Sequence, residues 1–104
     1  MEPSTPDSLD DLLKKLLKAV PEIEAAAIFS VEGFLIASAL PRDVDEKRTA
    51  AIIAALLSLS KKAILEMQKG DFDQLCIRGK EGYLLVLKVG PDAILIVSAA
   101  KDVR

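Results

Sequence analysis

The sequence predicts an α+β fold, with two helices and a five-stranded sheet in the order helix, strand, strand, helix, strand, strand, strand. Two segments with apolar residues at helical spacing alternate with short strand-like runs, and a glycine turn joins the first two runs. Helices are expected at residues 9–20 and 46–69, and strands at 25–30, 34–39, 72–78, 83–89 and 93–100. The chain has 104 residues, which suits one domain, expected at 8–104.

The first helix is amphipathic. Ser8 begins a capping-box pattern with Asp11, the leucines that follow recur at helical spacing, and Pro21 ends the helix. Residues 1–7 hold two prolines and little to bury, so we expect a disordered lead-in. The turn at 31–33 ends in Gly33, which can take the positive φ that a tight hairpin requires.

The second helix is expected to begin at Asp43 or Asp45 as its cap and to stop at Gly70. One set of apolar residues fills an arc of roughly 160° and is expected to pack on the sheet. That set is Ile52, Ile53, Leu56, Leu57, Leu59, Ala63, Ile64 and Met67. The opposite surface carries Ala50, Ala51, Ala54, Ala55, Ser58 and Leu65. Small residues let another helix approach closely, so we interpret this surface as a contact face, the alternative being an exposed alanine-rich helix.

The last two strands are nearly continuous apolar runs, which is typical of strands covered on both faces in the middle of a sheet. A five-stranded sheet is about 24 Å wide at roughly 4.8 Å per strand, and one helix is about 10 Å across. The first helix therefore cannot shield the outer face of both strands. Either a partner covers that face or a final helix is missing from this chain.

Composition excludes several kinds of function. The chain has no histidine and one cysteine, so it offers no Ser-His or Cys-His nucleophile, no disulfide framework and no thiolate zinc cluster. A net charge of −2 and few aromatic residues argue against nucleic acid. The acidic, polar start is unlike a signal peptide, and the longest apolar stretch, 50–59, is too short to span a membrane. We expect a cytoplasmic domain without catalytic, cofactor or metal sites.

The element order and several short signatures resemble the roadblock (dynein light-chain roadblock) domain family over residues 9–100. The segment 28–38 (IFSVEGFLIAS) resembles the family's first hairpin, and 50–59 (AAIIAALLSL) resembles its Ala/Leu-rich central helix. Residues 70–72 and 82–86 resemble the entries to its third and fourth strands. The resemblance implies a three-layer α/β/α fold with a five-stranded antiparallel sheet, from which this chain lacks the last helix.

The resemblance also implies a function. Family members commonly dimerise through their third strands and central helices, and act as scaffolds or regulators of small Ras-like GTPases or as motor-complex subunits. In style the chain is most similar to the prokaryotic GTPase regulators, whose paired central helices touch the GTPase. The matching partner-binding residues are Arg48, Ala51, Ala55, Ser58, Lys62 and Glu66. The matching dimer residues are Ala54, Leu65, Phe72, Gln74, Cys76 and Arg78.

Three hypotheses remain open at this point. The first is a non-catalytic homodimer that binds a small Ras-like GTPase and takes no small-molecule substrate. The second is a structural subunit that docks helices of a larger complex on its sheet or helix surfaces. The third is a ligand-sensing domain with an apolar pocket behind the sheet, which a densely packed aliphatic core without polar anchors does not favour.

Overall fold

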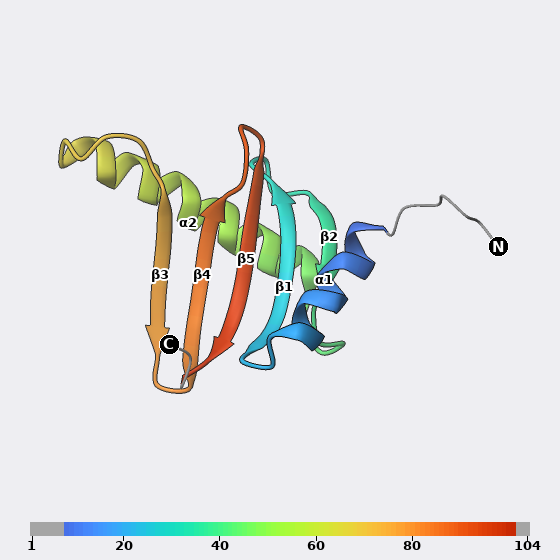
Figure 1. The fold of residues 1–104 in the computed structure, drawn as a ribbon. Coiled ribbons are helices and arrows are strands. Elements are labelled where there is room, and N and C mark those ends of the chain that lie inside the picture. The colour runs from blue at the N-terminus through green and yellow to red at the C-terminus, as the bar shows by residue number, and fades with distance from the viewer. Residues whose placement is uncertain (1–7, 102–104) are drawn as a thin grey trace.

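The computed structural model describes residues 8–101 and has the predicted α+β architecture (Figure 1). The expected lead-in at 1–7 and the last three residues lie outside the described part of the chain. The elements are α1 (Leu9–Ala19), β1 (Ile23–Ser30), β2 (Leu35–Ala39), α2 (Glu46–Glu66), β3 (Gln74–Gly79), β4 (Gly82–Lys88) and β5 (Ala93–Ala100). The strands form one sheet in the order β2-β1-β5-β4-β3, and every neighbouring pair is antiparallel.

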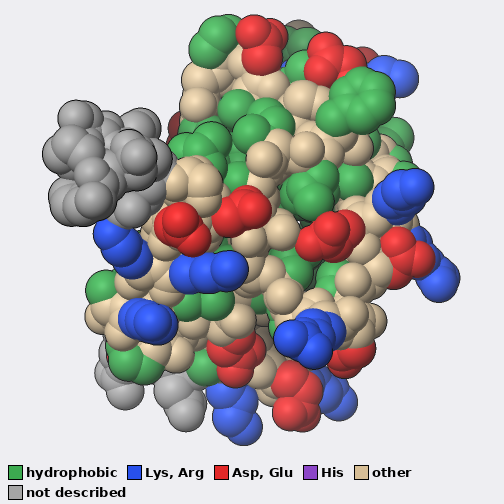
Figure 2. All heavy atoms as spheres, turned by 90° about the vertical axis from the view of Figure 1, so that its right-hand side faces the viewer, with side chains coloured by type: hydrophobic (Ala, Val, Ile, Leu, Met, Phe, Trp, Pro, Cys, Tyr) green, Lys and Arg blue, Asp and Glu red, His purple; other side chains and the backbone are tan. Residues whose placement is uncertain are grey.

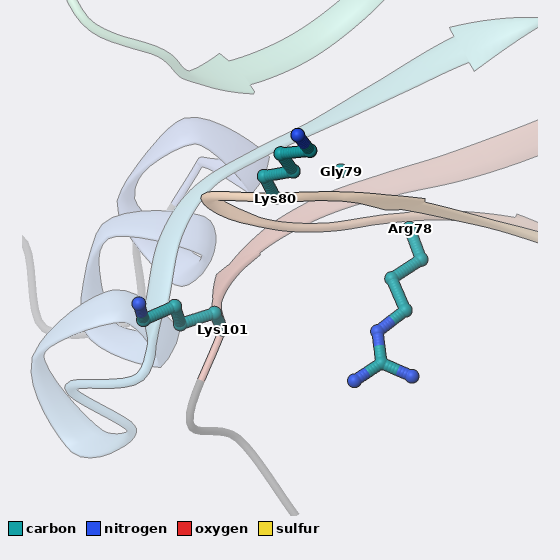
Figure 3. A pocket seen from close by; sticks show the side chains of 4 residues that line it. All are labelled: Arg78, Gly79, Lys80 and Lys101. Carbon is teal, nitrogen blue, oxygen red and sulfur yellow. The ribbon is translucent and has the colours of Figure 1, made fainter.

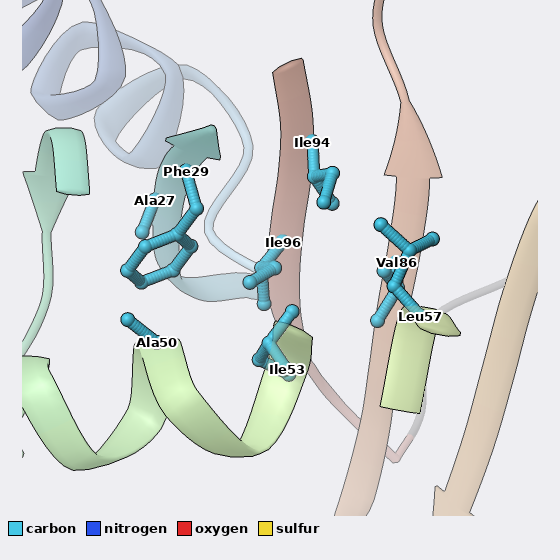
Figure 4. Packing of buried hydrophobic residues seen from close by; sticks show 8 residues of the cluster. All are labelled: Ala27, Phe29, Ala50, Ile53, Leu57, Val86, Ile94 and Ile96. Carbon is cyan, nitrogen blue, oxygen red and sulfur yellow. The ribbon is translucent and has the colours of Figure 1, made fainter. Parts of the chain in front are cut away.

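The two helices lie on opposite faces of the sheet, which we call the α1 face and the α2 face (Figure 1). On the α2 face, the ring of Phe29 in β1 packs between Ala27, also in β1, and Ala50 in α2 (Figure 4). Ile53 and Leu57 of α2 extend this core toward the β4 and β5 side chains. The apolar side chains that alternate along each strand therefore form the main core beneath α2.

A smaller core lies on the α1 face, where Leu13 of α1 packs against Ala26 of β1 and Ala37 of β2. Ser8 caps α1 as predicted, because its Oγ accepts a hydrogen bond from the backbone N–H of Asp11 at 3.1 Å. A carboxylate oxygen of Asp10 accepts a second bond, 2.8 Å long, from the backbone N–H of Ser38 in β2. These contacts hold α1 over the β1–β2 half of the sheet.

The turn between β1 and β2 has the predicted glycine geometry. Gly33 has a φ of +98°, and its N–H donates to the carbonyl of Ser30 at 2.9 Å. The Oγ of Ser30 also accepts from the backbone N–H of Phe34 at 3.0 Å. A Cβ at Gly33 would lie 3.4 Å from the Cβ of Ala54, so the turn rests closely against α2.

Helix α2 ends earlier than predicted, so the expectation that it runs to residue 69 and stops at Gly70 is wrong. Its last helical residue is Glu66, and Gln68 takes the left-handed conformation with a φ of +58°. The N–H of Lys69 donates to the carbonyl of Ile64, and that of Gln68 to Leu65, each at 3.0 Å. These two bonds form a Schellman motif, in which glutamine occupies the position that usually favours glycine.

The predicted strands differ from the observed ones mainly at their ends. The strand expected at 72–78 begins at Gln74, whereas β5 has the predicted bounds and lies at the centre of the sheet. The expectation that β4 is covered on both faces is wrong for its α1 face. In Figure 1, α1 lies in front of β1 and β2 and leaves the described front of β3 and β4 open.

The edge at β2 carries exposed hydrophobic side chains. Phe34 is 71% exposed, and Leu35 and Ile36 are also exposed. Figure 2 looks at this side of the molecule and shows hydrophobic side chains gathered in its upper part and charged side chains in its lower part. The described residues contain no helix long and apolar enough to cross a membrane.

Changing Gly82 to Ala is expected to destabilise the fold by about 1–3 kcal/mol, the usual range for overpacking. A Cβ at Gly82 would collide with the backbone carbonyl oxygen of Ala99 in β5, and backbone cannot move aside as a flexible side chain can. Urea unfolding followed by circular dichroism measures the change. Gly79→Ala is the comparison, because Gly79 is not a positive-φ glycine and its Cβ would lie 3.6 Å from the nearest atom, the backbone oxygen of Gly82; equal midpoints for the two variants would show that the contact with Ala99 is unimportant.

Candidate interaction surface on helix α2

Helix α2 is fixed at its start by side-chain contacts. Asp45 is its cap, because a carboxylate oxygen accepts from the backbone N–H of Arg48 at 3.1 Å. Glu46, in the first turn, accepts a hydrogen bond from the Oγ of Ser38 at 2.9 Å. The helix is thereby tied to β2, and of the two predicted caps Asp45 takes the role rather than Asp43.

The buried side of α2 differs from the predicted one. Ala50, Ile53 and Leu57 are buried against the sheet, whereas Ile52 is 51% and Leu59 63% exposed. The expected sheet-facing arc is therefore wrong for Ile52, Leu59, Ala63 and Met67, and Ala50 is not on the outer surface. The small side chain of Ala50 makes room for the Phe29 ring (Figure 4), which turns the helix so that its large residues at 52 and 59 face outward.

The predicted partner-binding residues share one exposed face. At 100° per residue they fall within about 80° of the helix circumference. They are Arg48, Ala51, Ala55, Ser58, Lys62 and Glu66, all exposed. Exposed Ile52 and Leu59 adjoin this face, although apolar periodicity alone predicts both for the sheet side. We call the six residues with Ile52 and Leu59 the α2 surface. It has a smooth apolar centre with charges at its ends and rim.

The predicted dimer residues fall into three groups. Gln74, Cys76 and Arg78 are exposed and alternate along β3 on the α1 face of the sheet. Leu65 is 60% exposed on α2. Ala54 and Phe72 are half-buried: Ala54 lies against the turn at Gly33, and Phe72 packs against the core.

β3 is an edge strand with mostly exposed side chains. In Figure 1 the C-terminal end of α2 extends past this edge. The exposed residues Leu65 and Met67 lie in this last part of the helix. The structure thus places a free strand edge and an overhanging helix end on the same side of the molecule.

The described residues offer little for catalysis or metal binding. Among residues 8–101, no group of three or more His, Cys, Asp or Glu side chains could hold a metal ion. Cys76 is exposed and forms no disulfide. A half-enclosed apolar pocket of about 260 Å³ lies beside the loop of Leu40, Pro41 and Val44. It is smaller than the roughly 300–1,000 Å³ of most small-molecule sites, so the ligand-sensing hypothesis gains no support from it.

The fold and this site define a small α+β domain with an exposed helix face on α2 and an exposed strand edge at β3. The Roadblock/LC7 domain family matches residues 9–99. The chain therefore belongs to the Roadblock/LC7 domain family.

The chain is similar to two bacterial proteins of known structure and, by sequence, to an archaeal protein. The structure is similar to the Roadblock/LC7 domain from Streptomyces avermitilis, with a TM-score of 0.81 and 26% identity over 92% of this chain and 81% of that one. It is also similar to MglB of Myxococcus xanthus, with a TM-score of 0.84 and 18% identity over 92% of this chain and 78% of that one. An uncharacterised protein of Methanocaldococcus jannaschii is 27% identical over 89% of this chain and 81% of its own length.

Proposed function

We propose that this protein is a non-catalytic, homodimeric scaffold or regulator that binds a small Ras-like GTPase through its paired α2 helices. The observation that carries the proposal is the α2 surface, where the predicted partner residues form one continuous exposed face beside exposed Ile52 and Leu59. Isolated exposed hydrophobic residues are normal, but a contiguous apolar patch marks a binding site.

Membership of the Roadblock/LC7 family supports the same reading, since family members act as scaffolds or regulators of such GTPases or as motor-complex subunits. We therefore place the protein in the cytoplasm, where such GTPases act.

The homodimer is supported by the free edge of β3 and the overhang of α2. Pairing two β3 strands across a two-fold axis perpendicular to the sheet extends the sheet and keeps both α2 helices on one face. That rotation brings the overhanging end of each α2, with Leu65 and Met67, toward the other copy. One isologous contact thus satisfies a strand edge and covers exposed apolar side chains.

A regulator of this kind acts by holding its GTPase and supplies no reacting group. The charged side chains of the α2 surface are Arg48, Lys62 and Glu66, and all three are exposed. Exposed charges of this kind steer association and set specificity more than they add affinity. Any change in GTP hydrolysis would then come from repositioning the GTPase's own groups.

One observation favours the second hypothesis, a structural subunit that docks helices of a larger complex. The α1 face of β3 and β4 has no covering helix among the described residues. The two functions use opposite faces of the sheet. Substitutions on the α2 surface should therefore affect GTPase binding, and substitutions on the α1 face should affect helix docking.

Two measurements test the proposed function. Light scattering is expected to give twice the monomer mass of 11.2 kDa, and a short bis-maleimide is expected to join two copies through Cys76, the only cysteine of the chain. Immobilised protein is then incubated with Ras-like GTPases loaded with GDP or a GTP analogue, with preference for one nucleotide state expected. A clean monomer at micromolar concentration contradicts the dimer, and no capture in either state contradicts the GTPase role.

A further inference from the structure

We propose that the open half of the α1 face is a docking groove for an amphipathic helix of another protein, and that this helix carries carboxylates at the end beside the β3–β4 turn. The groove lies on the opposite side of the sheet from the α2 surface. The docking proposal is therefore independent of the GTPase proposal. It specifies the face of the sheet that binds, and the chemistry and charge pattern of the partner helix.

The floor of the groove consists of side chains from β4 and β3 that point to the α1 face. Tyr83, Leu85 and Leu87 of β4 are half-buried, with no α1 residue packed over them. The strand register places Cys76 beside Leu85 and Gln74 beside Leu87. The floor is thus aliphatic along its centre and bordered by the exposed edge of β3.

One wall of the groove is a flank of α1. The carboxylate of Asp10 reaches the backbone of Ser38 in β2, so that flank of α1 faces the β2 edge. Leu12 and Leu16 lie about 160° and 120° around the helix from Asp10, at 100° per residue, and so face the open half of the sheet. Leu12 is exposed and Leu16 half-buried. A helix placed on the floor would therefore meet an apolar side wall as well.

The size of the groove suits one helix. The three strands β3, β4 and β5 span about 10–14 Å at roughly 4.8 Å per strand, and a helix with its side chains is about 10–12 Å across. One helix beside α1 would complete a layer over the whole sheet. The two described helices of a second copy each pack one face on their own sheet, so neither can leave that sheet to fill the groove as a separate helix.

The charge at one end of the groove indicates the partner's chemistry. Arg78, Lys80 and Lys101 line an open hollow of about 510 Å³ beside the β3–β4 turn (Figure 3). The guanidinium of Arg78 lies 5.4 Å from the centre of the Tyr83 ring, which belongs to the floor. Arg78 and Lys101 extend on one side of the turn in Figure 3, and Lys80 extends on the other.

None of these three cations forms an ion pair with a described carboxylate. Cations at the end of an apolar groove that pair with none of the described carboxylates are complementary to carboxylates on the occupant. Because Arg78 is already held over the Tyr83 ring, a carboxylate that reaches it would lie directly at the end of the floor. These observations favour a helix with an acidic end over a neutral or basic one.

Fluorescence anisotropy with stapled helical peptides tests the groove. The first probe has leucines at positions i, i+3, i+4 and i+7 and ends in a run of glutamates, and the second has glutamine in place of each glutamate. We expect the glutamate probe to bind about tenfold more tightly than the glutamine probe. The double variant Arg78→Glu with Lys101→Glu should remove this preference, and a lysine-ended probe should bind the double variant about as tightly as the glutamate probe binds the original protein.

A matched control keeps the test specific. Lys47→Glu with Lys69→Glu makes the same change in net charge at exposed positions of the α2 segment, and should leave binding of the glutamate probe unchanged. Leu85→Asn should weaken both probes, with its fold checked by circular dichroism. Equal binding of both probes, or no rescue by the lysine-ended probe, would overturn the proposal. Binding to anionic vesicles with no binding of either probe would also overturn it.

Discussion

Ala55→Glu is expected to abolish capture of the GTPase or to separate the proposed dimer into monomers of 11.2 kDa. Ala55 lies at the middle of the exposed arc of α2, with Ala51 and Ser58 on the adjacent turns. A glutamate there would bury an unpaired charge wherever this face packs against a partner, whether the GTPase or the second α2, and such a burial costs about 3–5 kcal/mol. Since each 1.4 kcal/mol is tenfold in affinity, dissociation should rise by at least ~100-fold.

A control variant and the choice of Ala55 rather than Ala54 allow a loss of binding to be attributed to the α2 surface. Ala19→Glu makes the same chemical change at an exposed position of α1, and should leave mass and binding unchanged. Ala54 is unsuitable for the test, because its half-buried side chain rests against the turn at Gly33 and its replacement would disturb the monomer. If Ala55→Glu keeps both the dimer mass and GTPase capture, then the α2 surface is simply exposed to solvent.

Phe29→Ala is expected to lower the free energy of unfolding by about 3–5 kcal/mol. The ring is 1% exposed and packs between β1 and Ala50 of α2, where it sets how the helix lies on the sheet (Figure 4). A domain of this size has a total stability of about 5–15 kcal/mol, so between about a fifth and the whole of the stability would be lost. Urea denaturation measures this loss.

Phe34→Ala is the matched comparison for Phe29→Ala. Phe34 is 71% exposed at the β1–β2 turn, so its truncation should change the unfolding free energy by no more than about 0.5 kcal/mol. A similar loss in the two variants would mean that the Phe29 ring is not the centre of the core. A secondary readout is dimer mass, which Phe29→Ala should also reduce if the orientation of α2 sets the interface.

The sequence was sufficient to predict the order of the elements, because each had a local signal. Ser8 and Asp11 marked the start of α1, Gly33 marked the first turn, and the apolar run at 93–100 marked the central strand. These features act over a few residues, and no distant contact overrides them.

The rotation of α2 could not be predicted in the same way. Apolar periodicity distinguishes faces only when one face is polar, and here alanines, isoleucines and leucines occupy most of the circumference. The deciding contact is between Ala50 and Phe29, which are far apart in the sequence. The end of α2 was missed for a related reason: Gln68 adopted the left-handed position two residues before the glycine that normally signals it.

The candidate site was predicted in part. The proposed partner residues are indeed exposed on one side of α2, but Ile52 and Leu59 had been placed in the core. The row of Gln74, Cys76 and Arg78 followed from strand alternation. The cation at Lys101 could not be connected with Arg78 from the sequence, because the antiparallel order of β3, β4 and β5 is what brings them to one end of the sheet.

The bond from Ser38 to the carboxylate of Asp10 makes the two borders of the sheet unequal. An unprotected border strand is a template for adding another chain, and a sheet with two such borders could grow into a fibre. At β2 the backbone N–H of Ser38 is already bonded, and the charged side chain of Asp10 lies beside the strand. The strand β3 forms the opposite edge of the sheet, away from α1. Addition through β3 alone joins two copies and leaves the β2 strands, each partly blocked by Asp10, at both outer ends. The position of one aspartate thus favours an assembly that stops at two over one that polymerises.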